Sequence, residues 1–283
     1  MNAGFYNIDI DTSTLVDLSK PDLDGQQELN CTQCVLLTEH IRKHQPRGIE
    51  VSLGGEIGEV GGKNSTVEEL TAFMDGYNRR LGQGVTGLSK ISVQTGTSHG
   101  GVVLPDGTMA TVKVDFDTLK ALSESAKSKY GMGGAVQHGA STLPVELFDN
   151  FPRTGACEIH LATEFQNIVY EHPAFPADLK KEMYAYLEKE CANERKDGES
   201  DAQFFYKTRK KALGPYKQKL WGLPEATRET LMGALEEKLD LLFRKLNIGG
   251  TGASIKPHVK FPADVPAAPG GGKAVAAAFE GDD

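Results

Sequence analysis

Two short stretches, "ISVQTGTSHGG" (Ile91–Gly101) and "GAVQHGAST" (Gly134–Thr142), decide how this sequence folds. Each is a run of strand-forming residues that ends in His-Gly, and a helical pattern follows each one along the chain. An imidazole is large and polar, and the glycine behind it removes side-chain bulk, so the pair is typical of a rim rather than a core. The two stretches predict strands whose ends carry a ligand.

The same order of strand and helix recurs on both sides of these stretches. Strands are predicted within residues 5–11, 48–58, 89–101, 133–142 and 157–165, with helical patterns over 26–44, 64–81, 115–131 and 144–155. We interpret the strands as apolar on both faces, which is typical of a parallel sheet covered by helices. The predicted fold class is therefore α/β.

Composition and charge argue against two classes of partner, nucleic acids and membranes. The chain has 283 residues and a net charge of -8, without clustered Lys and Arg among aromatics, which argues against a nucleic-acid partner. No apolar stretch approaches the roughly 20 residues that span a bilayer, so we expect no membrane partner. We expect a cytoplasmic protein that acts on a small molecule.

Metal-competent side chains follow successive predicted strands. Because the carboxyl ends of parallel strands meet at one edge of the sheet, these side chains are expected to converge there. Imidazole and carboxylate are ligands that Zn²⁺ prefers, and a catalytic zinc keeps an open position from which it polarises a carbonyl. The residues in question are Asp11, Glu56, His99, His138, His160 and Glu164, with Thr163 beside the last two.

Four motifs, in order and spacing, resemble the class II, metal-dependent fructose-bisphosphate aldolases. They are "NIDIDTSTL" (7–15), "GGEIGEVGG" (54–62), "GTSHG" (96–100) and "QHGAST" (137–142), and the resemblance covers residues 5 to about 167. It implies a TIM-type (β/α)8 barrel and a lyase of glycolysis or related carbohydrate metabolism.

The resemblance also implies roles for individual residues. His99 and His138, with Glu56, would bind zinc, and Glu56 and Asp11 would be the catalytic carboxylates beside a second divalent or monovalent cation. Gly100, Gly139 and Ser141 would bind a substrate phosphate, and His160 and Thr163 would contribute to the substrate pocket.

The implied reaction is reversible aldol cleavage of a ketose bisphosphate through a zinc-stabilised enediolate. Fructose 1,6-bisphosphate, or a close analogue, would give dihydroxyacetone phosphate and glyceraldehyde 3-phosphate. A homo-oligomer is expected.

The sequence departs from the family pattern in three places. The family's Asp-His pair is absent, and the chain begins at what would be the fourth strand, so about the last five of the eight βα units are expected. Val103 and Ala162 replace a Lys and an Asp that relatives place near the substrate. We predict a partial βα barrel over residues 1–176 carrying the metal and phosphate site, a helical extension over 177–250 and a flexible tail over 251–283.

These departures leave alternatives open. The chain could be a truncated or non-catalytic metal-binding or assembly subunit of an aldolase, or an aldolase for a different ketose. Taken without the resemblance, Asp11 could simply cap the turn that follows it, and Glu56 could be a solvated loop acid.

Overall fold

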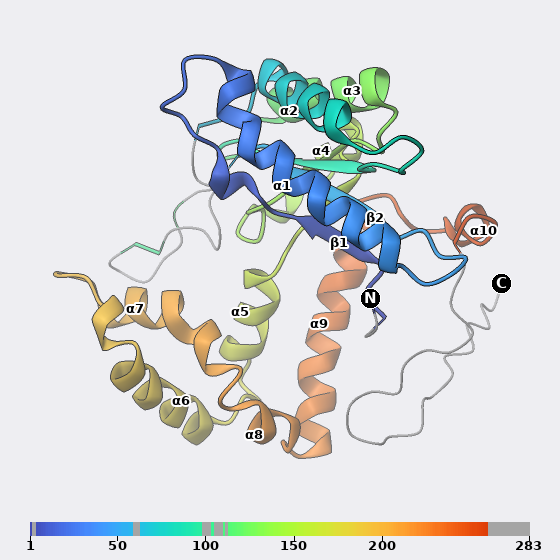
Figure 1. The fold of residues 1–283 in the computed structure, drawn as a ribbon. Helices are drawn as coiled ribbons and strands as arrows, with labels where there is room; N and C mark the ends of the chain where they lie inside the picture. Colours follow the sequence, from blue (N-terminus) through green and yellow to red (C-terminus); the bar gives the residue numbers. More distant parts are fainter. Residues whose placement is uncertain (2–3, 59–62, 98–102, 105–109, 111–112, 260–283) are drawn as a thin grey trace.

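The core of the protein is one parallel sheet that curls into a half-barrel (Figure 1). The structure is a computed structural model and describes residues 1, 4–58, 63–97, 103–104, 110 and 113–259. The strands follow one another in sequence order: β1 (Asn7–Ile10), β2 (Ser52–Glu56), β3 (Lys90–Val93), β4 (Ala135–Gln137) and β5 (Glu158–Ile159). The predicted α/β class and incomplete barrel are confirmed.

Helices connect the strands because parallel neighbours need a crossover. They are α1 (Leu23–His44), α2 (Val67–Arg80), α3 (Phe116–Tyr130) and the short α4 (Asn150–Thr154). Local sequence sets their ends. Thr66 and Glu69 form a reciprocal capping box at the start of α2, and Gly131 ends α3 in the left-handed conformation, with φ 65°.

The two faces of the sheet differ in polarity, which corrects the expectation that the strands are apolar on both faces. Side chains alternate between the faces of a strand. Leu53, Ile91 and Ala135 are fully buried in the apolar core. The alternate residues on the concave face are polar. Asn7, Asp9, Lys90 and Glu158 bond to one another, and Ser92 bonds to His138.

The remaining α-helices are α5 (Thr163–Glu171), α6 (Ala177–Glu190), α7 (Asp201–Thr208), α8 (Lys217–Trp221), α9 (Glu225–Lys245) and α10 (Gly252–Ile255). Of these, α5 to α9 form a second group below the half-barrel, and the short α10 lies apart from them (Figure 1). Tyr170 and Phe175 pack into the same apolar cluster as Met183 and Leu187, whereas Leu242 of α9 belongs to the cluster under the sheet. The predicted boundaries at residues 176 and 250 stay predictions, and residues 260–283 lie outside the described part.

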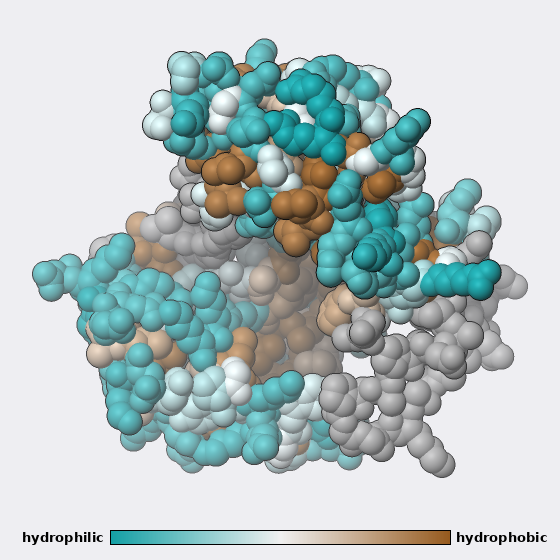
Figure 2. Space-filling view, in the orientation of Figure 1, coloured by the Kyte–Doolittle hydropathy of each residue, from teal (hydrophilic) through white to brown (hydrophobic). Residues whose placement is uncertain are grey.

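On the face drawn in Figure 2, apolar side chains gather over α1, above a hollow. Leu29, Leu36 and Leu37 are 53%, 54% and 45% exposed. In the described part of the chain, no helix is both long and apolar enough to cross a membrane.

Candidate functional site

The carboxyl edge of the sheet brings together a histidine and a carboxylate from different strands. His138 directly follows β4, and Glu56 is the last residue of β2. His138 Nδ1 lies 3.9 Å from Glu56 Oε1, and their side chains are 14% and 7% exposed. Ser92 Oγ lies 3.2 Å from the other ring nitrogen, His138 Nε2. The contact with the Ser92 hydroxyl at Nε2 leaves Nδ1 facing the carboxylate.

Buried amides of α1 hold the end of β2 in place. Asn30 Nδ2 donates to the carbonyl of Glu56 at 2.9 Å, and Gln27 Nε2 donates to the carbonyl of Ile57 at 3.0 Å. The Thr12 hydroxyl in turn donates to Asn30 Oδ1 at 2.6 Å. These buried polar groups satisfy one another and fix the backbone that carries the Glu56 carboxylate.

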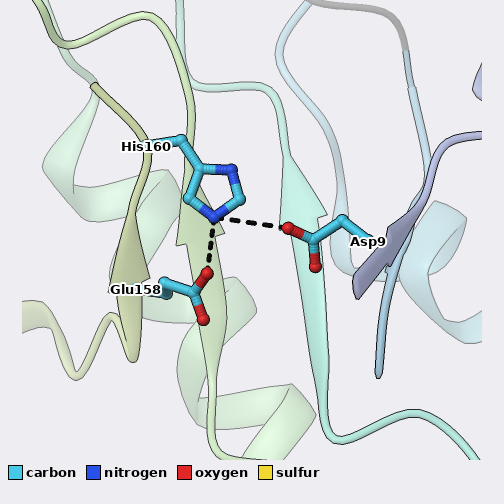
Figure 3. A group of neighbouring side chains, drawn as sticks. All are labelled: Asp9, Glu158 and His160. Atoms are coloured by element: carbon cyan, nitrogen blue, oxygen red, sulfur yellow. Dashed lines mark hydrogen bonds and ion pairs between the residues drawn. The ribbon is translucent and has the colours of Figure 1, made fainter. Parts of the chain in front are cut away.

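His160, just beyond β5, extends the site toward β1. Its ring stacks on that of His138, with centroids 4.5 Å apart and planes at 25°. Its Nε2 lies 2.6 Å from Glu158 Oε1 and 3.3 Å from Asp9 Oδ2 (Figure 3). The imidazole therefore links the carboxyl edge to the polar groups deeper in the concave face.

Lys90 is the centre of those deeper groups. Its ammonium is 3% exposed and lies 2.6 Å from Glu158 Oε2, 3.0 Å from Asp9 Oδ1 and 2.6 Å from Asn7 Oδ1. Asn7 Nδ2 also donates to Glu158 Oε1 at 3.0 Å. A buried charge is tolerated only when it is paired and hydrogen-bonded, as Lys90 is here. We call Asn7, Asp9, Lys90 and Glu158 the interior cluster.

Gly54 of β2 makes room for the interior cluster. It pairs with Asp9 on one side and Lys90 on the other. A Cβ at this position would lie 2.1 Å from Asp9 Oδ1 and 3.0 Å from Lys90 Cε. A glycine is therefore needed where the two charged side chains meet.

Asp9, Glu158 and His160 are also a set of three groups whose donor atoms lie within 4.8 Å of one another. Two ligands at about 2.1 Å from one tetrahedral ion would sit roughly 3.4 Å apart. The 2.6 Å separation between His160 Nε2 and Glu158 Oε1 is instead that of a strong hydrogen bond. The geometry favours a proton, carried on Nε2, between these groups.

The charge of Glu158 is fixed by its neighbours. Burial raises the pKa of this carboxyl, but hydrogen bonds from His160, Lys90 and Asn7 outweigh burial and lower the pKa to about 2. Glu158 is therefore ionised at neutral pH.

The other predicted residues have different surroundings. His99 and Gly100 lie outside the described residues. Asp11 is exposed, and its Oδ1 accepts from the Ser13 amide at 3.1 Å and the Ser13 hydroxyl at 2.7 Å, which is the geometry of a turn cap. Its catalytic role stays a prediction.

Gly139 and Ser141 lie in the loop that follows β4, and Thr163 lies where α5 begins after β5. Gly139 adopts a φ of 70°, and Ser141 Oγ accepts from the Ala162 amide at 3.2 Å. Thr163 is the first residue of α5. Ser141 thus joins the two loops, and its phosphate-binding role stays a prediction.

The sequence interpretation missed Asp9, Lys90, Ser92 and Glu158. A signal was present, because Asn7, Asp9 and Asp11 alternate with isoleucines. Alternation of this kind predicts one polar face of a strand.

Comparisons with known proteins agree with this architecture. The family model described as fructose-bisphosphate aldolase class-II matches residues 7–219. None of the curated proteins compared with the chain matches it.

Three solved structures resemble the chain. A protein of Sinorhizobium meliloti 1021 described as a probable tagatose 6 phosphate kinase has a TM-score of 0.50 at 12% identity, covering 89% of this chain and 66% of that one. Fructose-bisphosphate aldolase of Campylobacter jejuni gives 0.47 at 16%, covering 85% and 60%. The YdjI aldolase of Escherichia coli K12 gives 0.34 at 14%, covering 75% and 59%. The chain thus spans about 60% of the length of the two aldolases.

The fold and site define an α/β half-barrel with its polar residues at the carboxyl edge of a parallel sheet. With the match over residues 7–219, the chain belongs to the class II fructose-bisphosphate aldolase family.

Proposed function

We propose that this chain carries the site of a metal-dependent aldolase, which cleaves and forms a carbon–carbon bond in a phosphorylated ketose. The observation that supports it is the pairing of His138 with Glu56 at 3.9 Å at the carboxyl edge, in a chain of this family. Ligands of parallel α/β sheets bind at this edge.

The donor groups at the edge fit a divalent metal. An imidazole nitrogen and a carboxylate oxygen, both largely buried and facing one another, are the types of ligand that Zn²⁺ takes. His138 and Glu56 would hold the ion together with His99. A zinc ion bound there supplies a Lewis acid that polarises the substrate carbonyl.

The chain's own residues would complete the site. Ser92 orients the ring of His138, and Asn30 fixes the backbone of Glu56. The backbone N–H of Gly139, which has no side chain to cover it, and the hydroxyl of Ser141 would bind a phosphate. Thr163 and His160 would contact the sugar. Asp11 and Glu56 would be the carboxylates beside a second cation.

The experiment is a measurement of zinc content and of fructose 1,6-bisphosphate cleavage by the full chain. We expect about one zinc per chain, lost together with cleavage in His138→Ala and retained in His258→Ala, which changes an exposed histidine outside the site. Cleavage that survives His138→Ala would contradict the proposal. A panel of other phosphorylated ketoses would identify a different substrate.

A non-catalytic metal-binding or assembly subunit is the second candidate. The absence of the family's Asp-His pair from this sequence favours it. Zinc binding without cleavage of any ketose in the panel would establish it over the aldolase. The cytoplasmic location also remains a prediction.

A further inference from the structure

The proposed aldol site does not account for the interior cluster. Asn7, Asp9, Lys90 and Glu158 lie deeper in the concave face than the carboxyl edge, and their charges pair with one another. Their contact with the edge runs through His160, which lies against both carboxylates and against His138. The question is what this connection does.

The bonding pattern divides the carboxylate oxygens between two partners. Lys90 takes Asp9 Oδ1 and Glu158 Oε2, while His160 Nε2 faces Asp9 Oδ2 and Glu158 Oε1. Each carboxylate thus contacts Lys90 with one oxygen and His160 with the other. Rotation of either carboxylate would break at least one of these two contacts. The ammonium, which is 3% exposed, therefore fixes the position of the two oxygens that hold the imidazole.

The two contacts fix the imidazole in turn. Its Nε2 is held from below by the carboxylates, and its face is held by the ring of His138. Nδ1 lies on the side of the ring away from both carboxylates (Figure 3), and the described residues give it no hydrogen-bond partner. It is the ring atom left to meet a ligand at the carboxyl edge.

We propose that Lys90, with Asn7, Asp9 and Glu158, is a positioning residue that acts through His160. The cluster holds the imidazole stacked on His138, with Nδ1 placed to contact a hydroxyl of the bound sugar phosphate. This inference rests on the proposed function for the identity of the ligand, and on the described contacts alone for the placement of the ring. It makes the charged interior of the half-barrel part of the site.

The test is a double-mutant cycle with Lys90→Met and His160→Ala, using dihydroxyacetone phosphate as the probe for binding and fructose 1,6-bisphosphate for kcat and KM. Each single variant should weaken probe binding roughly tenfold, the value of one well-placed hydrogen bond. In the double variant, the loss should not exceed that of His160→Ala alone. Independent, additive losses would overturn the proposal.

A second measurement needs no substrate. Cross-relaxation between the ring protons of His138 and His160, in protein labelled at histidine, should be strong in the wild type and lost in Lys90→Met. Lys129→Met is the matched control, since Lys129 pairs with Asp75 at an exposed position. Ring contact that persists in Lys90→Met would refute the positioning role, even if no aldol cleavage is found.

Lys90→Met leaves two carboxylates without their buried partner, which can cost the fold itself. Asn7→Ala is the milder variant, because Asn7 is exposed and contributes one bond to Lys90 and one to Glu158. A smaller loss of probe binding is expected, and it should vanish in the His160→Ala background. An undiminished loss in that background would again overturn the proposal.

Discussion

At the scale of single residues, the neighbours of Glu158 strongly lower the pKa of its carboxyl. Its carboxylate accepts hydrogen bonds from three different segments of the chain, through Asn7, Lys90 and His160. Together these bonds overcome the effect of burial and lower its pKa from 4.5 to about 2. The ionised form is therefore favoured by folding.

This shift makes stability depend on pH in a defined window. Because the pKa is lower in the folded than in the unfolded chain, Glu158 contributes stability above its ordinary pKa of 4.5, and this contribution is lost as pH falls toward about 2. In Glu158→Gln, the free energy of unfolding, measured by urea titration, should decrease less as the pH is lowered through this window than it does in the wild type. Glu124→Gln, at an exposed position on α3, should keep the wild-type slope. Equal slopes in Glu158→Gln and the wild type would show that Glu158 is not responsible.

At the scale of secondary-structure elements, the sequence predicted the order of strands and helices well. The helix predicted within 64–81 begins at its Thr66 capping box, and the one predicted within 115–131 ends at Gly131. These signals are local, so the sequence carries them in full. β5 comprises only Glu158 and Ile159, which pair with Val136 and Gln137 of β4, whereas the sequence predicted a strand within the longer range 157–165.

The site was predicted less completely than the fold. The convergence of His138 and Glu56 follows from their places at the ends of parallel strands. The contacts among Asn7, Lys90 and Glu158 join strands far apart in sequence, and depend on how strongly the sheet curls. No local pattern encodes that curvature, although the polar alternation in residues 7–11 marks the face involved.

Strand β2 gives a direct test of how tightly the concave face is packed. In Gly54→Ala, the new methyl group would meet the carboxylate of Asp9, which must move away from Lys90 or from His160. We expect a loss of about 1–3 kcal/mol in the free energy of unfolding, measured by urea titration.

Gly233→Ala is the control for that substitution. Gly233 lies in α9, and a Cβ there meets nothing within 4 Å. Removing a glycine from the interior of a helix should stabilise the protein by up to about 1 kcal/mol. If Gly54→Ala were as stable as the wild type, the close approach of Asp9 would not constrain the strand.

At the scale of the whole molecule, the leucines exposed on α1 bear on the expected self-association. Leu29 and Leu36 are two helical turns apart and more than half exposed, on a helix whose other face is buried. Clusters of exposed apolar side chains are typical of protein–protein contacts.

If the chain forms a homo-oligomer through α1, Leu36→Glu should shift its mass in sedimentation equilibrium toward that of a monomer. Leu213→Glu changes a leucine that is 40% exposed in the segment between α7 and α8, and it should leave the mass unchanged. A wild-type protein that sediments as a monomer at all concentrations would contradict the expectation.

The contact between Asn7 and Glu158 joins residues 151 positions apart, the first strand to the last. Closing so long a loop costs entropy before any bond across it can form. We therefore expect the ion pairs of Lys90 with Asp9 and Glu158 to form late during folding, after the intervening strands are in place. Contacts that form late are expected to slow the opening of the finished sheet rather than to speed its assembly.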